Sequence, residues 1–200
     1  LHTHLAETLD EEAFCLAQHG VRPLGLMERL GWLGDDVWFA HGVHFNDAEL
    51  DLLAATQTGV AHCPVSNLRL GSGIARVPEM LARGIPVGLA VDGSASNDAS
   101  NMLRELQMAL LVHRVGTGVS SMPARDVFGM ATRGGARILG FEEAGVLAEG
   151  KLADVVFWRV DDVSYAGAMS DPVAALLFTG RNQTVDGNIV NGQWVVRDHE

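Results

Sequence analysis

Short, largely apolar runs recur along the first half of the chain, and each one leads into a polar residue. The four runs are LHTHLA before Glu7, VWFA before His41, GVA before His62 and VGLAV before Asp92. Runs that are apolar rather than alternating are typical of strands covered on both faces, as in a parallel sheet. The pattern predicts four parallel strands whose carboxyl ends carry polar side chains.

Segments with helical periodicity follow these runs. The helices that we expect cover residues 11–19, 47–57, 77–83 and 101–115. Asn46, with Glu49 three residues later, forms a capping-box pattern at the start of the second helix, and Gly84 is a natural stop for the third. The SNLRLGSG stretch after the third strand is interpreted as a loop. Strands that alternate with helices in this way predict an α/β fold.

The pattern changes after Met122. The elements predicted there are a proline-opened helix over residues 123–132, a short helix in RGGARILG, a strand over residues 153–159 and a hairpin over residues 184–196. Asn191-Gly192 suits the positive φ angles of a two-residue type I′ turn in this hairpin. We therefore expect two domains, residues 1–145 and residues 146–200.

Four strand–helix units are half of a (β/α)8 TIM barrel, for which about 250 residues is typical. A half barrel would leave two open sheet edges, which favour aggregation unless they are paired or covered. We therefore expect residues 1–145 to be the C-terminal half of such a barrel, strands 5 to 8, within a longer protein.

The composition is that of a globular protein, since 48% of the 200 residues are hydrophobic and 20% are charged. A formal net charge of -11 repels phosphate backbones and anionic lipids, so we expect neither a nucleic acid nor a membrane as a partner. No apolar run approaches the ~20 residues that span a bilayer. The cysteines Cys15 and Cys63 form no CxxC motif, which fits a reducing cytoplasm better than a disulfide framework.

The polar residues at the expected strand ends are types that bind metals. In a β/α barrel the active site lies at this edge of the sheet. Imidazole and carboxylate groups suit Zn²⁺ or a similar ion, and a hydrolytic site keeps one coordination position for water. Simpler interpretations stay open, because an aspartate before a glycine, such as Asp92, is often only a turn residue. The residues alone thus allow either a metal site or a hydrated strand edge.

Four motifs decide between these interpretations by resemblance. HTHLAE, FAHG, AHCPVSNLRLGSG and VDGSASNDASN occur in this order and together resemble the amidohydrolase superfamily, in its branch of cytosine-deaminase-like, purine and triazine aminohydrolases. The C-terminal GKLADVVFW and VNGQWVV are similar to the small β-sandwich that follows the barrel in this superfamily. The resemblance implies that residues 146–200 are part of that sandwich.

The resemblance also implies roles. His4 and Asp92 are expected to hold one divalent metal ion, Zn²⁺ or alternatively Fe²⁺. Glu7 is expected to transfer protons, Asp92 to accept a proton from the attacking water, and His41 to hydrogen-bond that water or the substrate. His2 and His4 do not supply the His-x-His ligand pair that the superfamily carries on its first barrel strand, because the Leu-Ala-Glu that follows them resembles the fifth strand. The chain is therefore expected to hold half of the metal site.

Other polar residues are assigned more loosely. His62 and Arg69 are candidate substrate contacts, although His62 could equally satisfy backbone groups and Arg69 could face solvent. Asn97 is a candidate for orienting Asp92. The residues expected to cap the helix near residue 101 are Ser94, Ser96, Asn97 and Asp98. Packed or surface positions without chemistry are expected for His2, His19, His44, His113, His199 and Cys63.

The function implied by the resemblance is hydrolytic deamination of an aminopurine, with 8-oxoguanine converted to urate and ammonia as the favoured reaction. A hydroxytriazine or another aminoheterocycle is the alternative substrate, and a non-catalytic barrel scaffold is the alternative from another class. A scaffold would have no reason to keep four polar residues together at strand ends. We also expect a small heterocyclic substrate as the partner, a homo-oligomer and a cytoplasmic location.

Overall fold

The computed structural model describes residues 1–179, 184–198 and 200. Its first part is a parallel sheet in the order β1-β2-β3-β4. The strands of this sheet are β1 (His2–Leu5), β2 (Trp38–His41), β3 (Gly59–His62) and β4 (Val87–Leu89). The predicted parallel strands and their order along the chain are confirmed.

Helices follow each strand of this sheet. They are α1 (Leu9–His19), α2 (Pro23–Arg29), α3 (Asp47–Thr56), α4 (Pro64–Leu70), α5 (Val77–Ala82) and α6 (Met102–Thr117). The capping box of Asn46 and Glu49 at α3 is confirmed. Gly84 follows α5 with a φ of 75°, in the left-handed conformation that glycine adopts without strain. Its backbone N donates to the carbonyl oxygen of Leu81 at the end of the helix.

Two interpretations of the region around α4 and α6 were wrong. The SNLRLGSG stretch is not a loop throughout, because α4 begins at Pro64 and continues to Leu70. The cap of α6 is Asn101, whose side chain accepts from the backbone N of Arg104, rather than any residue between 94 and 98. An adjacent asparagine satisfies the first free amides, so the residues between 94 and 98 stay available for other contacts.

The two short helices predicted after Met122 form one continuous rod. It comprises α7 (Ala124–Gly129), the π-helical turn η1 (Met130–Gly134) and α8 (Gly135–Ile138). This rod approaches the sheet closely because the facing positions are glycines. A Cβ on Gly59 or Gly88 would lie 2.8 or 2.6 Å from Ile138, and a Cβ on Gly134 would lie 2.1 Å from the carbonyl oxygen of Val87.

The second part of the chain is an antiparallel sheet in the order β5-β6-β7, with a helix beside it. The elements are β5 (Val155–Phe157), the 3₁₀ turn η2 (Val163–Tyr165), α9 (Pro172–Thr179), β6 (Gly187–Val190) and β7 (Gln193–Arg197). The predicted hairpin turn is confirmed, since Asn191 and Gly192 have φ angles of 49° and 76°. Helix α9 was not expected from the sequence, and residues 180–183 at the start of the connection to the hairpin lie outside the described residues.

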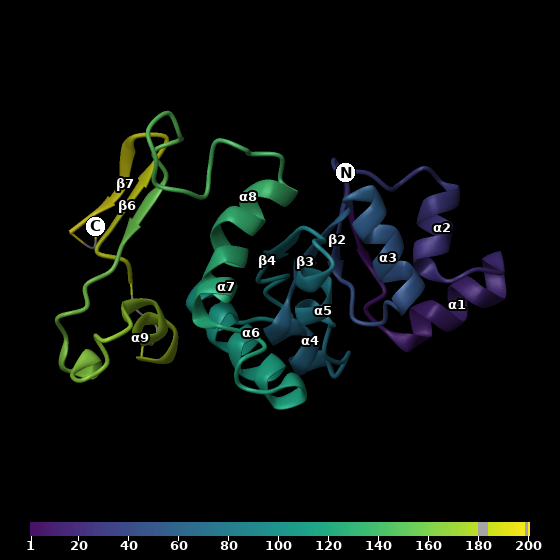
Figure 1. Cartoon of the computed structure of the whole chain (residues 1–200), viewed down its shortest axis with the longest axis horizontal. Coiled ribbons are helices and arrows are strands. Elements are labelled where there is room, and N and C mark those ends of the chain that lie inside the picture. The colour runs from purple at the N-terminus through teal and green to yellow at the C-terminus, as the bar shows by residue number, and fades with distance from the viewer. Residues whose placement is uncertain (180–183, 199) are drawn as a thin grey trace.

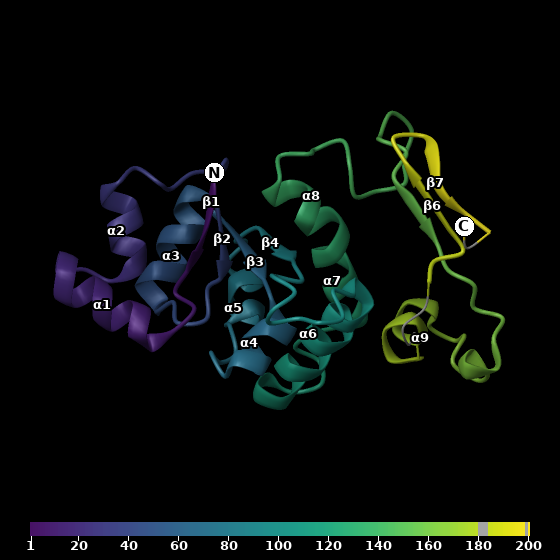
Figure 2. The same ribbon diagram turned by 180° about the vertical axis from the view of Figure 1, so that it is seen from behind.

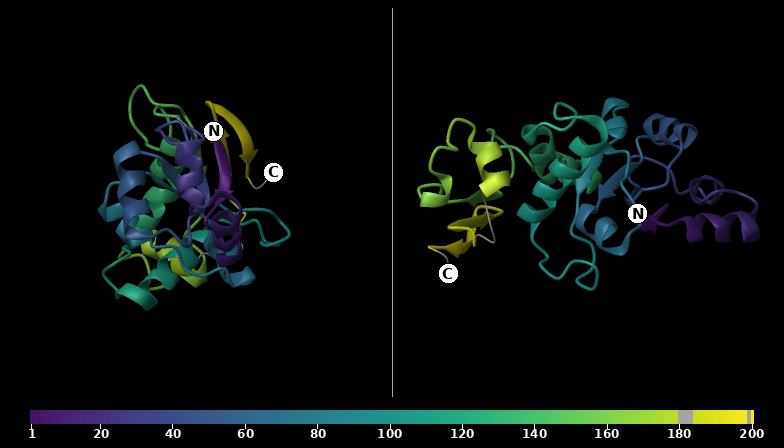
Figure 3. Two further views of the ribbon diagram at one scale, coloured as in Figure 1. Left: turned by 90° about the vertical axis from the view of Figure 1, so that its right-hand side faces the viewer. Right: turned by 90° about the horizontal axis from the view of Figure 1, so that it is seen from below.

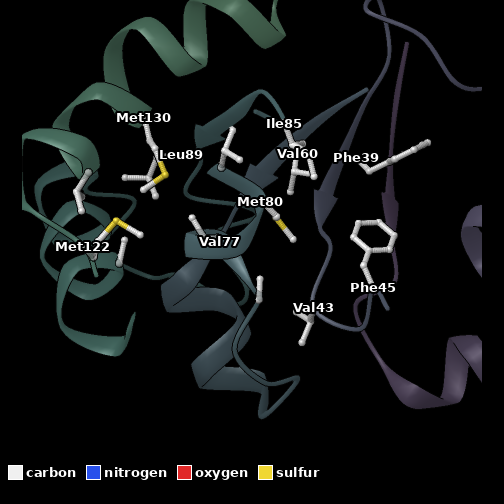
Figure 4. Close-up of a cluster of buried hydrophobic side chains, with 14 of the residues drawn as sticks. Phe39, Val43, Phe45, Val60, Val77, Met80, Ile85, Leu89, Met122 and Met130 are labelled. Carbon is white, nitrogen blue, oxygen red and sulfur yellow. The ribbon is translucent and has the colours of Figure 1, made fainter. Parts of the chain in front are cut away.

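The elements follow one another along the longest axis of the molecule (Figure 1). Helices α6, α7 and α8 stand between the parallel sheet and the β6–β7 hairpin, as the view from behind also shows (Figure 2). Seen from below, α1 and the C-terminal strands lie at opposite ends (Figure 3). One hydrophobic core lies between the parallel sheet and the helices. It contains Phe39 and Val60 of the sheet, Met80 of α5 and Met122 before α7 (Figure 4). Leu177 of α9 belongs to the same core, so the C-terminal part is anchored to the first part.

The helices show no sign of a membrane span. Within the described ranges, none is both long and apolar enough to cross a bilayer.

The contact between Gly134 and the sheet gives a stability prediction. We expect Gly134→Ala to lower the free energy of unfolding by about 1–3 kcal/mol, because the new methyl group would force η1 away from β4. Gly116→Ala is the control, since Gly116 lies exposed in α6 with open space around the position of an added methyl group, and alanine there should stabilise the helix by about 0.5–1 kcal/mol. Denaturant unfolding of both variants measures the difference, and a Gly134→Ala protein as stable as the parent would refute the close packing.

Candidate metal centre

The backbone turns into the left-handed region at three of the strand ends. Ala6 follows β1 with a φ of 53°, His41 ends β2 with a φ of 74°, and Asp92 follows β4 with a φ of 62°. Non-glycine residues in this region cost on the order of 1–3 kcal/mol each and persist only when the surroundings hold them. Each of these turns carries or precedes a side chain of the predicted site, so the contacts that hold the turns also position the site.

A carboxylate on α1 holds the first turn. The two side-chain oxygens of Glu11 accept hydrogen bonds from the backbone N of Ala6 and of Glu7, each at 2.9 Å. Thr8 caps α1 directly after this turn. The Glu7 carboxylate also accepts a hydrogen bond of 3.2 Å from the hydroxyl of Ser72. Glu7 is therefore fixed at both its backbone and its side chain.

The second turn orients a fully buried histidine. Nδ1 of His41 lies 2.8 Å from Oδ1 of Asn67, and an amide oxygen can only accept, so Nδ1 carries the proton. Nε2 of His41 is buried as well, and it has no hydrogen-bond partner among the described residues. It lies 3.6 Å from Oε2 of Glu7 and 3.9 Å from Oδ2 of Asp92.

The third turn carries Asp92, which two serines hold. Ser66 donates to its Oδ2 at 2.5 Å, and the hydroxyl of Ser96 lies 3.1 Å from the same oxygen. Partial burial disfavours the charged form, but the hydrogen bonds from Ser66, the backbone at Gly93 and Ser96 outweigh it and lower the pKa of Asp92. The other oxygen, Oδ1, lies 3.9 Å from Nε2 of His4.

Three of these side chains form a group that could hold a metal ion, and Asp92 lies beside it. Ligand atoms of His4, Glu7 and His41 all lie within 4.8 Å of one another. Two ligands that each sit ~2.1 Å from one ion can be at most ~4.2 Å apart, so the 3.9 Å between His4 and Asp92 allows a shared ion. Imidazole nitrogens and carboxylate oxygens are the donors that Zn²⁺ accepts, and the unpartnered nitrogen of His41 points to a group that binds there.

The structure places His62 in a different buried cluster. Its Nε2 lies 3.1 Å from Nε2 of His113 on α6, a partner 51 residues away that no sequence pattern indicated. Burial, with the neighbouring histidines His113 and His41 as further causes, lowers the pKa of His62 well below its usual value. Burial also lowers the pKa of His113 to about 4. The two rings therefore form a neutral pair at neutral pH.

Arg69 lies at the surface, where its guanidinium pairs with the carboxylate of Asp98. A substrate contact of Arg69 thus stays a prediction. Asn97, the candidate for orienting Asp92, contacts the backbone beside it, since its Nδ2 donates to the carbonyl oxygen of the preceding residue, Val91, at 2.7 Å.

The remaining side chains of interest have structural partners. The ring of His2 stacks on Trp38 at 4.2 Å, and Nε2 of His44 lies 3.0 Å from the carbonyl oxygen of Ser72. Cys63 is buried, and its burial raises the pKa of the thiol to about 12. His19 is exposed at the end of α1, and His199 lies outside the described residues.

Sequence analysis missed the residues that support the site. These are Glu11, Ser66, Asn67 and Ser72. The available signal was Cys63-Pro64 at the end of the third run, because a proline there favours a helix start that would place Ser66 and Asn67 on the first turn beside the strand ends.

Known proteins with similar sequences and structures place the chain in a family. The model of the amidohydrolase family matches residues 1–195. The chain belongs to the amidohydrolase family.

Among the relatives of this amidohydrolase chain is an 8-oxoguanine deaminase of Pseudomonas aeruginosa, 48% identical over 198 residues, a match that covers 99% of the chain and 44% of the relative. A 5-methylthioadenosine/S-adenosylhomocysteine deaminase of Desulforudis audaxviator is 44% identical over 199 residues, covering 98% of the chain and 46% of the relative. The crystal structure of an atrazine chlorohydrolase of Arthrobacter aurescens complexed with zinc superimposes with a TM-score of 0.94 at 38% identity, covering 100% of the chain and 44% of that protein. The chain thus spans less than half the length of these relatives.

The neutral histidine pair predicts a dependence of stability on pH. Unfolded histidines protonate near pH 6.5, whereas folded His113 protonates near pH 4. The stabilisation is therefore complete above about pH 6.5 and is lost as the pH falls from there towards 4. We expect His113→Leu to reduce the slope of unfolding free energy against pH in this window by about 1.4 kcal/mol per pH unit, as one proton fewer is taken up on unfolding.

Denaturant unfolding at several pH values between 4 and 7 measures this slope. His19→Gln, which changes an exposed histidine, is the matched control and should keep the parent slope. An unaltered slope in His113→Leu would show that His113 is not a buried neutral residue.

Proposed function

We propose that the chain supplies metal-holding and proton-transferring groups of an aminohydrolase that deaminates an aminopurine, converting 8-oxoguanine to urate and ammonia. The observation that carries this proposal is the convergence of His4, Glu7, His41 and Asp92 at the carboxyl ends of parallel strands. It is supported by 48% identity to an 8-oxoguanine deaminase over 198 residues.

The architecture that we propose for the whole protein is a (β/α)8 barrel of which residues 1–145 form strands 5 to 8. Residues 146–200 then form part of a β-sandwich domain. Two observations support this architecture. The sheet is open, in the order β1-β2-β3-β4, and the chain spans only 44% of the length of the related 8-oxoguanine deaminase. The barrel strands that precede β1 would contribute the further metal ligands. A homo-oligomeric state and a cytoplasmic location stay predictions.

In the proposed site His4 and Asp92 hold one divalent ion, and Zn²⁺ is the preferred identity because the neighbouring atrazine chlorohydrolase is complexed with zinc. A metal ion at such a site lowers the pKa of bound water to ~7 and so supplies hydroxide at neutral pH. Of the two protons of the attacking water, Asp92 would accept one as the water oxygen bonds to the amino-bearing ring carbon, and the other would go to Glu7. Nε2 of His41, buried and without a hydrogen-bond partner among the described residues, would hydrogen-bond the water or the substrate and orient it.

Glu7 completes the reaction by moving protons on the substrate. It would carry one proton of the attacking water to the ring nitrogen next to the reacting carbon, which makes that carbon more electrophilic, and would later pass the second proton, which Asp92 accepts, to the leaving amine. The bond from carbon to the exocyclic nitrogen then breaks, ammonia leaves and a carbonyl remains. The hydrogen bond from Ser72 and the two backbone contacts of Glu11 keep the Glu7 carboxylate in place between these steps.

A triazine is the second candidate substrate. The likeness to an atrazine chlorohydrolase, with a TM-score of 0.94, supports it. Triazines and aminopurines share an amidine-like carbon beside a ring nitrogen, so the same four residues serve both. Groups that face the second ring of a purine would decide between them.

The roles of the two carboxylates predict different failures. In the full-length protein we expect Asp92→Asn to lose metal and turnover together, because a ligand is removed. Glu7→Gln should keep most of the metal while losing most of kcat, because only proton transfer is removed. Metal content by elemental analysis and ammonia release measure the two effects.

Asp51→Asn provides the control, as it makes the same change at an exposed carboxylate on α3 that pairs with Arg83. It should retain metal and turnover. Equal metal loss in Glu7→Gln and Asp92→Asn would mean that Glu7 is a ligand rather than a proton carrier.

The substrate prediction concerns selectivity. We expect the metal-loaded full-length enzyme to release ammonia from 8-oxoguanine with a higher kcat/KM than from guanine or a hydroxylated aminotriazine. A buried site that hydrogen-bonds an oxo group can reject an analogue without it by ~10⁴-fold. A preference for the triazine would overturn the purine assignment and leave the roles of the four residues unchanged.

A further inference from the structure

Behind the metal centre lies a second carboxylate that the proposed reaction does not use. Glu105 on α6 is fully buried, with none of its surface exposed to solvent. Its burial raises the pKa of its carboxyl group, although hydrogen bonds from the backbone of Val65 and from Asn97 act in the opposite direction. Among the described residues no basic side chain is hydrogen-bonded to this buried carboxylate, and its two hydrogen-bond partners offset part of the cost of burying it.

The first partner belongs to α4. Oε2 of Glu105 accepts a hydrogen bond of 3.1 Å from the backbone N of Val65, in the first turn of α4. No side chain next to α4 caps this helix, so Glu105 replaces the missing cap from a distant helix. The next two residues of α4 are Ser66, which donates to Asp92, and Asn67, which holds Nδ1 of His41.

The second partner belongs to the turn after β4. Oε1 of Glu105 lies 2.6 Å from Nδ2 of Asn97, and the same amide nitrogen donates to the carbonyl oxygen of Val91 at 2.7 Å. Both hydrogens of the Asn97 amide are thereby used. Val91 directly precedes Asp92, whose left-handed φ of 62° needs such support.

We propose that Glu105 is a positioning residue of the metal centre, which braces α4 and the Asp92 turn with its two oxygens and so sets the arrangement of His41 and Asp92. This rests on the proposed function, because it concerns the metal that His4 and Asp92 would hold. A carboxylate suits the place because both groups that face it are donors. In a glutamine one of the two oxygens is replaced by an NH₂ group. That group would face a donor, so one of the two hydrogen bonds would be lost.

The test is the variant Glu105→Gln in the full-length protein, with Zn²⁺ affinity measured by competition with a chromogenic chelator. We expect an affinity loss of about 10-fold, the lower end for groups that orient metal ligands, and a matching fall in kcat with a smaller change in KM. The matched control is Leu110→Ala, a change at another buried position of α6. It should lower the thermal midpoint and leave the Zn²⁺ affinity unchanged.

Asn97→Ala, which removes one of the two contacts, covers the case in which Glu105→Gln does not fold. It should weaken Zn²⁺ binding by itself. The double variant should lose less affinity than the two single losses added together, since both residues act in one chain of contacts. Unchanged Zn²⁺ affinity in Glu105→Gln and in Asn97→Ala, with a clear loss in Asp92→Asn, would overturn this proposal and leave the proposed function standing. Unchanged affinity in Asp92→Asn would overturn the proposed function instead.

Discussion

The left-handed backbone at the ends of β1, β2 and β4 is the constraint on which the site depends. A strand that continued straight would send successive side chains to opposite faces of the sheet, and Glu7, His41 and Asp92 would not meet. Ala6, His41 and Asp92 instead reverse the local direction of the chain, and none of them is glycine. The strain is confined to these three residues, and polar side chains that lie next to each of them in space support it.

Each turn is held by a different kind of group. Glu11 satisfies two adjacent amides at the first turn, Asn67 fixes a ring at the second, and Ser66 with Ser96 binds the carboxylate at the third. Each support is a polar side chain on a residue that is itself at least half buried, so a displaced hydrogen bond is not readily replaced by one to water. Buried polar networks specify one arrangement when every member is satisfied. In this network Nδ2 of Asn67 lacks a hydrogen-bond partner among the described residues, so the second turn is the least completely satisfied of the three.

The sequence predicted those features whose signal is a periodic pattern or lies within a few neighbouring residues. The parallel strands and the four helices between residues 9 and 117 that the periodicity predicted agree with the structure to within two residues at each end. The missed helices α2, α4 and α9 begin at Pro23, Pro64 and Pro172. They are no shorter than the predicted α5, so the signal left unused was the proline at the first helical position rather than periodicity. The strand-end residues could be named from sequence, but their supports could not, since Ser66 and Asp92 are 26 residues apart and Val65 and Glu105 are 40.

The four central side chains are not held equally firmly, and the difference indicates how the site accepts a metal. The side chain of His41 is fully buried and that of Asp92 is 12% exposed, whereas that of His4 is 59% exposed. Within the described part of the chain, the ring of His4 has an edge contact with His41 at 4.8 Å but no hydrogen bond to fix it. The contacts within the described residues therefore fix the orienting histidine and one ligand through the folding of this part of the chain. His4 lies on the edge strand β1, where the barrel strands proposed to precede it, together with a bound ion, would supply the further restraint.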